Sequence, residues 1–489
     1  MGCEARVLFG LLTLLNTIHR TAFEGQMLFN DEQIRVLCSI RNGGDGSHGD
    51  YTELRKFGLN SGLLIPDFFG EGNRQDFFRD QTQRLESKIA AGGKTVIKEI
   101  FLDVFGFSRG AAEARVFCNW LERLLIDQKI AGISVRFRFV GIFDTVAAGG
   151  FWSGVNSAVT NTPDGHSGWA SVEYLRLPRV LENCVHMVAM HELRRNFPLD
   201  TAGIDGKLPP NTQEIVYPGT HSDVGGGYAP GELGCFMGEN FVEGDSLKLS
   251  QIPLNHMFEC AVSAGAPMEK NYAIVKLVYA PLENRVRRDV AVNNPSQLDK
   301  KTISLIFDFF ALSASLINAY NAFITASSLN PRELNEWMQP YLNWRWQKRF
   351  RYEELLHVYR ANEKDKKILR KFNLMLIKDA ELIEKVSRKN KVFSSMVFIG
   401  NDTLEKADRI EFSLLDKEAK SILDIAKKSP NVPAPIQFLF DNFLHDSLAG
   451  FNSKELEPAG YWRYRRGFLG RANGGIVMRE DNNYEAKLS

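Results

Sequence analysis

The pattern of hydrophobic and polar residues over the first 295 positions predicts short strands that alternate with helices. Apolar runs of strand length occupy 98–105, 133–143 and 214–218. In the second run, apolar residues alternate with Arg136 and Arg138, as in a strand whose two faces differ. Glycine-rich connections separate the runs. We therefore expect an α/β fold with a mostly parallel central sheet flanked by helices.

The first of these strands leads into the pentapeptide GFSRG at 106–110. Apolar residues then recur at helical spacing over 116–125, so the pentapeptide lies between a strand and a helix. In α/β-hydrolases such a turn lifts a serine hydroxyl clear of the sheet. A chain with 40 glycines can contain G-x-S-x-G by chance, so the motif alone is weak. Its context makes Ser108 the candidate nucleophile and the backbone N–H of Arg109 a candidate oxyanion donor.

A serine nucleophile needs a histidine base and a carboxylate that orients the base. In α/β-hydrolases these residues follow in the order serine, acid, histidine. Asp144 stands at the end of the strand predicted over 133–143, and His221 follows the strand at 214–218. Because the carboxyl ends of parallel strands share one edge of a sheet, we expect Ser108, Asp144 and His221 to form a triad.

Other residues compete for the roles of acid and base. Asp223 follows the candidate base by two residues and could serve as the acid or orient the loop. His445, in FLHDSLAGF, could serve as the base or line the pocket together with Asp446. A capping aspartate or a hydrogen-bonded core histidine is the structural alternative for each. We interpret His186 and His191 as structural or pocket-lining.

From about residue 296 to 430 the sequence becomes helical and rich in charge, as solvated helix faces are. The segment KKSPNVPAPI has three prolines in ten residues and predicts a linker. The apolar segment after it is expected to rejoin the core. We predict a catalytic domain over 1–295 that is completed by 431–489, and a helical, membrane-docking region over 296–430.

Composition and charge narrow the function classes. Lys and Arg number 60 against 59 Asp and Glu, which leaves a formal charge of +1. The chain therefore lacks the basic excess typical of proteins that bind nucleic acid. Its six cysteines are scattered without a C-x-x-C pair, and no two histidines have the spacing of a zinc motif. We expect reduced thiols, no metal and no cofactor.

The apolar segments do not have the features of membrane-targeting signals. The run at 7–15 has the length of a signal peptide, but Glu4 precedes it and no A-x-A-like cleavage site follows. The longest apolar stretch, 303–326, is interrupted by Asp308 and by two asparagines, which disfavour a transmembrane helix. We expect no cleaved signal peptide and only peripheral contact with membranes.

Five segments in order resemble the phospholipase A family of type VI secretion lipase effectors, which belong to the α/β-hydrolase superfamily: DVFGFSRGAAEAR, VGIFDTVA, HMVAMHELRRNF, YPGTHSDVGGGY and FLHDSLAGF…GYWRYRRGF. The resemblance implies an antibacterial toxin, made in the bacterial cytoplasm and injected into a neighbour's periplasm, that cuts acyl chains from membrane phospholipids. It also implies a cognate immunity protein and loading on a spike protein of the secretion machine. The family roles fall on Ser108 as nucleophile, Asp144 as acid and His221 as base.

The sequence departs from this family in two places. Members usually open with a strand that ends in an Asp-Gly-Thr loop near the active site, whereas NGGDGSHGD at 42–50 is only a loose echo. The second oxyanion donor is therefore not identified. This chain also has His191 where the family commonly has aspartate, and we expect that difference to alter pocket polarity without touching the triad.

A phospholipid lies in a membrane surface, so mixed aromatic and basic segments bear on function. Such residues interleave at 335–352 and again at 460–471. Membrane docking and ordinary packing of arginine stems on aromatic rings both explain this pattern. The leading hypothesis is a serine phospholipase A with an acyl-enzyme intermediate. The alternatives are a membrane-docking or pore-forming toxin with a vestigial hydrolase centre, and a soluble esterase for small acyl substrates.

Overall fold

The computed structural model describes most of the chain. The described residues are 3–39, 71–147, 168–194, 197–239, 241–269, 273–277, 303–307, 312–327, 334–389, 418–428, 431–450, 460–470, 476–478 and 486–488. The segment 42–50, considered above as an echo of the family's first loop, lies outside these residues.

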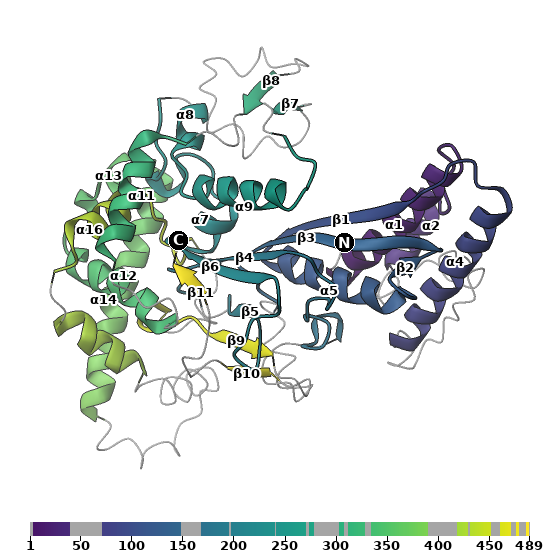
Figure 1. Ribbon diagram of the computed structural model, residues 1–489. Helices are drawn as coiled ribbons and strands as arrows, with labels where there is room; N and C mark the ends of the chain where they lie inside the picture. The colour runs from purple at the N-terminus through teal and green to yellow at the C-terminus, as the bar shows by residue number, and fades with distance from the viewer. Residues whose placement is uncertain are drawn as a thin grey trace.

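A six-stranded, mostly parallel sheet lies at the centre of the molecule (Figure 1). Strands β1, β3, β4, β6 and β11 run parallel in that order, and β2 pairs antiparallel with β3. Their bounds are β1 Glu99–Phe107, β2 Lys129–Ile130, β3 Ile133–Phe143, β4 Cys184–Ala189, β6 Thr212–Tyr217 and β11 Ala486–Leu488. The predicted strands fall on β1, β3 and β6, and the α/β-hydrolase-like fold class is confirmed.

A second sheet brings the end of the chain back to the middle of the fold. Its order is β10-β9-β5, and β9 runs parallel to β5. The bounds are β5 Leu199–Ile204, β9 Gly467–Gly470 and β10 Ile476–Met478. A separate antiparallel pair consists of β7 Ala273–Leu277 and β8 Ile303–Phe307. Because β9 pairs with β5, the residues just before β9 lie near the loops that follow β4.

Helix α5, Arg109–Leu124, packs on the central sheet next to β1. Around it lie α1 Cys3–Ala22, α2 Asp31–Ser39 and α4 Glu71–Gly92. The apolar run at 7–15 forms the buried face of α1, where Leu8, Leu11 and Leu12 share a core with α5. These residues therefore contribute to a folded interior.

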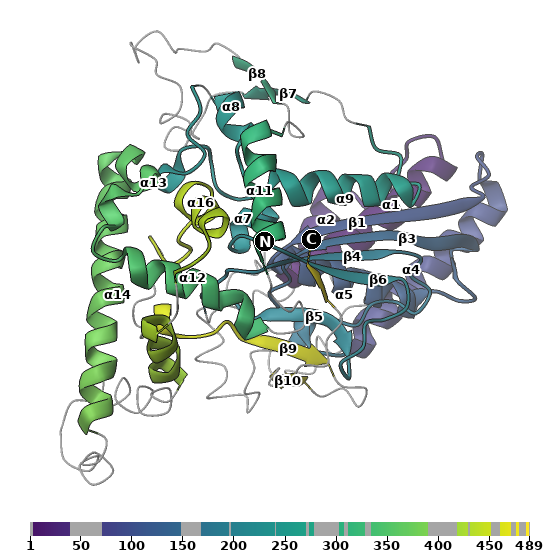
Figure 2. The same cartoon turned by 60° about the vertical axis from the view of Figure 1, so that its left-hand side comes forward.

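The remaining helices are α7 His221–Gly225, α8 Phe241–Ser246, α9 Gln251–Ser263, α11 Ala314–Ala326, α12 Leu334–Lys348, α13 Leu356–Arg360, α14 Glu363–Lys389 and α16 Ala434–Asn442. Of these, α9 packs on the face of β3 and β4, and most of the others lie toward the carboxyl ends of the strands (Figure 1 and Figure 2). Short 3₁₀ turns occupy Gly168–Ala170, Glu232–Gly234, Tyr352–Glu354 and Gly460–Trp462. Helices α14 and α4 lie at opposite ends of the molecule (Figure 2). One hydrophobic core joins Met187 and Tyr217 of the sheet with Trp337, Phe440 and Trp462.

Most of the interleaved aromatic and basic residues at 335–352 belong to this core. Trp337 and Tyr341 are buried, and so is the guanidinium of Arg345, which lies 4.0 Å from the ring centre of Tyr352. Phe350, by contrast, is 75% exposed. Ordinary packing therefore accounts for most of the pattern. Within the described residues, no helix combines the length and apolarity needed to cross a membrane.

Candidate active site

Ser108 occupies a strained turn between β1 and α5. Its backbone φ is 60° and its ψ is −124°, a conformation that costs a non-glycine residue about 1–3 kcal/mol. The turn is held because the Ser108 N–H donates to the Phe143 carbonyl at 2.9 Å, and the Ser108 carbonyl accepts from Val146 N–H at 3.3 Å. The half-buried side chain makes no cap hydrogen bond with α5. The Ser108 hydroxyl is therefore not used by the helix that it precedes.

Gly106 is the glycine that this turn requires, and Gly110 is not. A Cβ on Gly106 would lie 2.3 Å from the Gly110 carbonyl oxygen, whereas a Cβ on Gly110 would meet nothing within 4 Å. We expect Gly106→Ala to lower the free energy of unfolding by about 1–3 kcal/mol. Gly110→Ala, in the first turn of α5, should change it by less than ~1 kcal/mol. Denaturant titration of both variants checks this, and equal losses would contradict it.

Asp144 and His221 form a buried pair at the carboxyl edge of the same sheet. The His221 Nδ1–H donates to Asp144 Oδ2 at 2.5 Å. Asp144 directly follows β3 with a φ of 42°, and its N–H donates to the Met187 carbonyl of β4 at 2.7 Å. The His221 ring lies 4.5 Å from the ring centre of Phe107, the residue before Ser108. The structure thus brings the three predicted triad residues to one corner.

Charge and burial shift the pKa values of Asp144 and His221 in opposite directions. Burial alone raises the pKa of Asp144, but the charge of Arg465 and the hydrogen bond from His221 outweigh it and hold that pKa well below its ordinary value. For His221, burial outweighs the attraction of Asp144 and lowers the imidazole pKa. At neutral pH the pair is therefore a carboxylate and a neutral imidazole with Nδ1 protonated. Within the described residues, His221 Nε2 makes no hydrogen bond and remains able to accept a proton.

Glu192 supports the loop that carries His221. The His221 N–H donates to Glu192 Oε2 at 3.1 Å, and Ser447 Oγ donates to Glu192 Oε1 at 3.0 Å. Arg194 donates two side-chain hydrogen bonds to the same carboxylate, at 2.9 and 3.0 Å. Burial raises the pKa of Glu192, but Arg194 outweighs it and lowers that pKa to about 2. Glu192 is therefore a fixed negative group behind the backbone of His221.

His445 has both ring nitrogens occupied. Nδ1 donates to Asp223 Oδ1 at 2.7 Å, and Nε2 donates to the Glu232 carbonyl at 3.0 Å. Two acceptors require two N–H groups, so His445 is an imidazolium. Burial lowers its pKa, but contacts with Cys235 and Asp223 outweigh this and raise it well above the ordinary value. His445 is thus poorly suited to act as a base.

Asp223, the alternative acid, forms the buried ion pair with His445. Its Oδ2 accepts from Thr220 N–H at 3.0 Å, from Thr220 Oγ1 at 2.8 Å and from His445 N–H at 3.1 Å. This is the capping box of the short helix α7, whose first residue is His221. Asp223 therefore shapes the turn beside His221, while Asp144 occupies the His221 ring nitrogen.

The other candidates lie in separate networks. Asp446 accepts from Tyr461 Oη at 2.6 Å and from Arg345 at 3.3 Å. His186 donates from Nδ1 to Glu214 at 2.6 Å. Burial lowers the pKa of His191 to about 3, so this histidine is neutral. Its Nδ1 accepts from the Gly219 N–H at 3.0 Å, and aromatic rings surround it.

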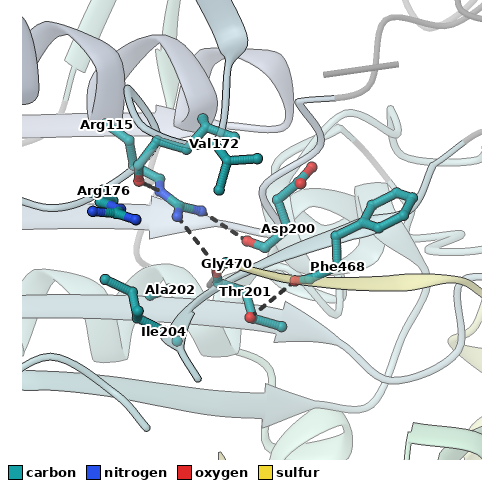
Figure 3. A pocket seen from close by; sticks show the side chains of 11 residues that line it. Arg115, Val172, Arg176, Asp200, Thr201, Ala202, Ile204, Phe468 and Gly470 are labelled. Atoms are coloured by element: carbon teal, nitrogen blue, oxygen red, sulfur yellow. Dashed lines mark hydrogen bonds between the residues drawn. The ribbon is translucent and has the colours of Figure 1, made fainter. Parts of the chain in front are cut away.

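A small pocket lies beside α5 and β5 (Figure 3). Arg115 donates to the carbonyls of Leu175, Asp200 and Thr201 at 2.7–3.1 Å. The cavity volume is about 20 Å³, enough for about one water molecule. Asp200 also accepts from the Ala147 N–H at 2.6 Å. Arg115 therefore connects α5, the helix after Ser108, to β5. Strand β5 in turn holds Ala147, three residues after Asp144, through the side chain of Asp200.

Sequence reasoning did not find Glu192, Arg194, Ser447 or Arg465. All four lie inside segments that carried the family resemblance, but nothing in their spacing indicates their partners. Within the described part of the chain, no group of three or more His, Cys, Asp or Glu residues is placed to hold a metal ion.

Comparisons with known proteins bear on this arrangement. Residues 125–260 match a family model described as the catalytic domain of Tle1-like phospholipase effectors of the type VI secretion system. An uncharacterized protein from Pseudomonas aeruginosa is 23% identical with a TM-score of 0.56, over 96% of this chain and 69% of that chain. The Tle1 effector bound to the VgrG spike of the type 6 secretion system is 19% identical with a TM-score of 0.21, over 81% of this chain and 64% of that chain. No curated protein matches.

The Pseudomonas aeruginosa structure shows that the fold is shared. The segment matched by the family model includes Asp144 and His221, and Ser108 precedes it. The match confirms the resemblance seen in the sequence: residues 125–260 are similar to the catalytic domain of Tle1-like phospholipase effectors of the type VI secretion system.

Proposed function

We propose that this protein is a type VI secretion effector and a serine phospholipase A that works through an acyl-enzyme intermediate. The observation that carries the proposal is the buried His221–Asp144 hydrogen bond beside the strained turn of Ser108. A serine on a sharp turn, a neutral histidine and an ionised acid are the groups that acyl transfer from an ester requires. The family match supports phospholipid as the substrate class.

In the proposed reaction, Ser108 Oγ attacks the acyl carbonyl carbon while His221 Nε2 accepts the hydroxyl proton. Asp144 stabilises the imidazolium, which then gives its proton to the leaving alcohol oxygen, and lysophospholipid departs. Water, deprotonated by His221, then attacks the acyl ester; the bond to Ser108 Oγ breaks, Oγ takes the proton back from His221, and the fatty acid is released. Within the described residues Ser108 Oγ makes no hydrogen bond, and hydrogen bonds between catalytic groups commonly tighten only when substrate binds.

The oxyanion is proposed to lie at the N-terminus of α5. This helix begins at Arg109, so the Arg109 N–H and the positive end of the helix dipole face the carbonyl oxygen of an acyl group bound at Ser108.

The remaining features of the family are proposed for this chain as a whole. They are delivery to the periplasm of a target cell, loading on a spike protein, and inhibition by a cognate immunity protein. The division into a catalytic domain over 1–295 and 431–489 and a helical region over 296–430 belongs to the same proposal. For membrane contact we propose Phe350 and Tyr359 of that region, which are 75% and 72% exposed.

Vesicles of a phospholipid with different labelled chains at sn-1 and sn-2 test this function. We expect the wild-type protein to release one labelled fatty acid and leave a lysophospholipid. His221→Ala should lower the rate by about 10⁴-fold, because the base is lost. His445→Ala, measured at a temperature at which it is folded, should keep its rate within about tenfold.

The opposite ranking of the two histidine variants would transfer the role of base to His445. Cleavage on the headgroup side, or no cleavage, would contradict a phospholipase A. Dye leakage from vesicles of non-hydrolysable ether lipids would instead favour the pore-forming alternative.

A further inference from the structure

The side chain of Arg465 joins the candidate triad to a remote part of the chain. Nη1 donates to Asp144 Oδ1 at 2.8 Å and Nη2 donates to Asp144 Oδ2 at 2.7 Å, across 321 residues of sequence. Both side chains are buried. Two parallel hydrogen bonds fix the plane of a carboxylate as well as its position. The orientation of Asp144 therefore depends on Arg465.

The guanidinium of Arg465 is itself held by backbone atoms. Its Nε donates to the Phe197 carbonyl at 2.7 Å, and Nη1 also reaches the Ala189 carbonyl at 3.4 Å. The Ala189 N–H donates in turn to Asp144 Oδ1 at 2.9 Å. These contacts leave Asp144 Oδ2 directed at His221 Nδ1. Rotation of the Arg465 side chain would break its hydrogen bonds to Asp144, to the Phe197 carbonyl and to the Ala189 carbonyl.

We propose that Arg465 is a positioning residue of the catalytic centre, which orients Asp144 toward His221 and offsets the charge that Asp144 exerts on the imidazole. The inference rests on the proposed serine-hydrolase function. Arg465 acts through Asp144, so it contributes orientation and charge and exchanges no proton.

Three charged groups act directly on His221: Asp144, after β3, and Glu192 favour the imidazolium, and Arg194 opposes it. Arg465, before β9, acts on His221 through Asp144, whose carboxylate it pairs with. Glu192, after β4, lies at the His221 backbone and is offset by Arg194. With each carboxylate paired to an arginine, burial dominates and the pKa of His221 lies below its ordinary value. Loss of the Arg465 charge leaves Asp144 uncompensated and raises the pKa of His221.

The pH dependence of kcat/KM for fatty-acid release tests this inference. The acid limb is the pH range in which kcat/KM rises as His221 loses its proton, and the plateau is the constant value above it. In the wild type, the midpoint of this limb lies below pH ~6.5 because the pKa of His221 is lower than that of an ordinary histidine. We expect Arg465→Gln to move the limb to higher pH and to lower the plateau by about 10–100-fold. Arg465→Lys keeps the charge but not the two-point contact, so its limb should stay near the wild-type position while its plateau falls.

Arg136→Gln is the matched control. Arg136 also makes a two-point contact with a carboxylate, from Nε and Nη2 to Glu182 at 2.6 and 2.8 Å, but this exposed pair lies near the opposite end of β3 from Asp144. We expect Arg136→Gln to change neither the acid limb nor the plateau of kcat/KM. A limb that moves equally in the two glutamine variants would overturn the inference. If Arg465→Gln does not fold, a wild-type plateau in Arg465→Lys would overturn it as well.

Titration of the His221 ring by NMR separates this inference from the proposed function. His221→Gln identifies the resonance among the nine histidines. A higher midpoint in Arg465→Gln than in the wild type supports the inference even if no variant hydrolyses lipid, in which case the proposed function alone fails. An unchanged midpoint in folded Arg465→Gln overturns the inference even if the wild type is active.

Discussion

Replacing Ser108 with alanine is expected to lower the rate of fatty-acid release by about 10⁴-fold or more while the fold persists. The reason is that the proposed acyl-enzyme forms on the Ser108 hydroxyl, so removal of that oxygen leaves no atom to carry the acyl group. The hydroxyl makes no hydrogen bond within the described residues, and alanine meets the same backbone cost as serine at a φ of 60°. Lipid hydrolysis and thermal unfolding of the same preparation measure both effects.

Ser447→Ala provides the matched control for this experiment. Ser447 is a second serine beside the site, but it is buried and its hydroxyl donates to Glu192 at 3.0 Å. We expect this variant to lose about 1 kcal/mol of stability and to remain active. If Ser108→Ala stayed active, or if both variants lost activity equally, the role of Ser108 as nucleophile would be refuted.

Replacing Asp223 with alanine is expected to lower the free energy of unfolding by about 3–5 kcal/mol. The substitution leaves the His445 imidazolium buried without its carboxylate, and it removes the acceptor that Thr220 uses at the start of α7. Denaturant titration measures the loss. Asp144→Asn, by contrast, should lower the rate of fatty-acid release by about 10⁴-fold in the folded protein, because Asp144 directs the proposed base.

The loss in Asp223→Ala should depend on pH in a defined direction. The pKa of His445 is raised in the folded state, so the pair contributes its full stability below the ordinary histidine pKa of ~6.5. That contribution is lost as the pH rises through the raised value. The difference in free energy of unfolding between the wild type and Asp223→Ala should therefore be largest at acidic pH and smaller at alkaline pH. A stable but inactive Asp223→Ala would contradict this account and favour Asp223 as the catalytic acid.

The elements around the site follow from local sequence patterns. The strand before Ser108, the strand before Asp144 and the helix after Ser108 could be predicted because apolar spacing along a short segment determines each of them. The parallel sheet then brings Ser108 and Asp144 to one edge. His221 could be proposed from its order in the chain, since it also follows a strand of that sheet.

The supporting contacts could not be predicted in this way. Whether His445 is a base or a structural imidazolium depends on acceptors at both ring nitrogens, and the Glu232 carbonyl is fixed only by the fold. The mixed aromatic and basic run likewise suits a membrane surface or a core. Only packing shows that Arg345 stacks on Tyr352 inside the protein. Long-range partners such as Arg465 and Asp144 leave no periodic signal in either segment.

The same long-range contact determines when, during synthesis, the centre can acquire its final geometry. A bacterial ribosome adds about 5–20 residues per second. Arg465 therefore follows Asp144, 321 residues earlier, by about 15–65 s. Contacts that close so long a loop form late in folding. If the chain has the proposed phospholipase activity, this order keeps its catalytic centre incomplete until most of the chain has left the ribosome, which limits damage to the membranes of the cell that makes it.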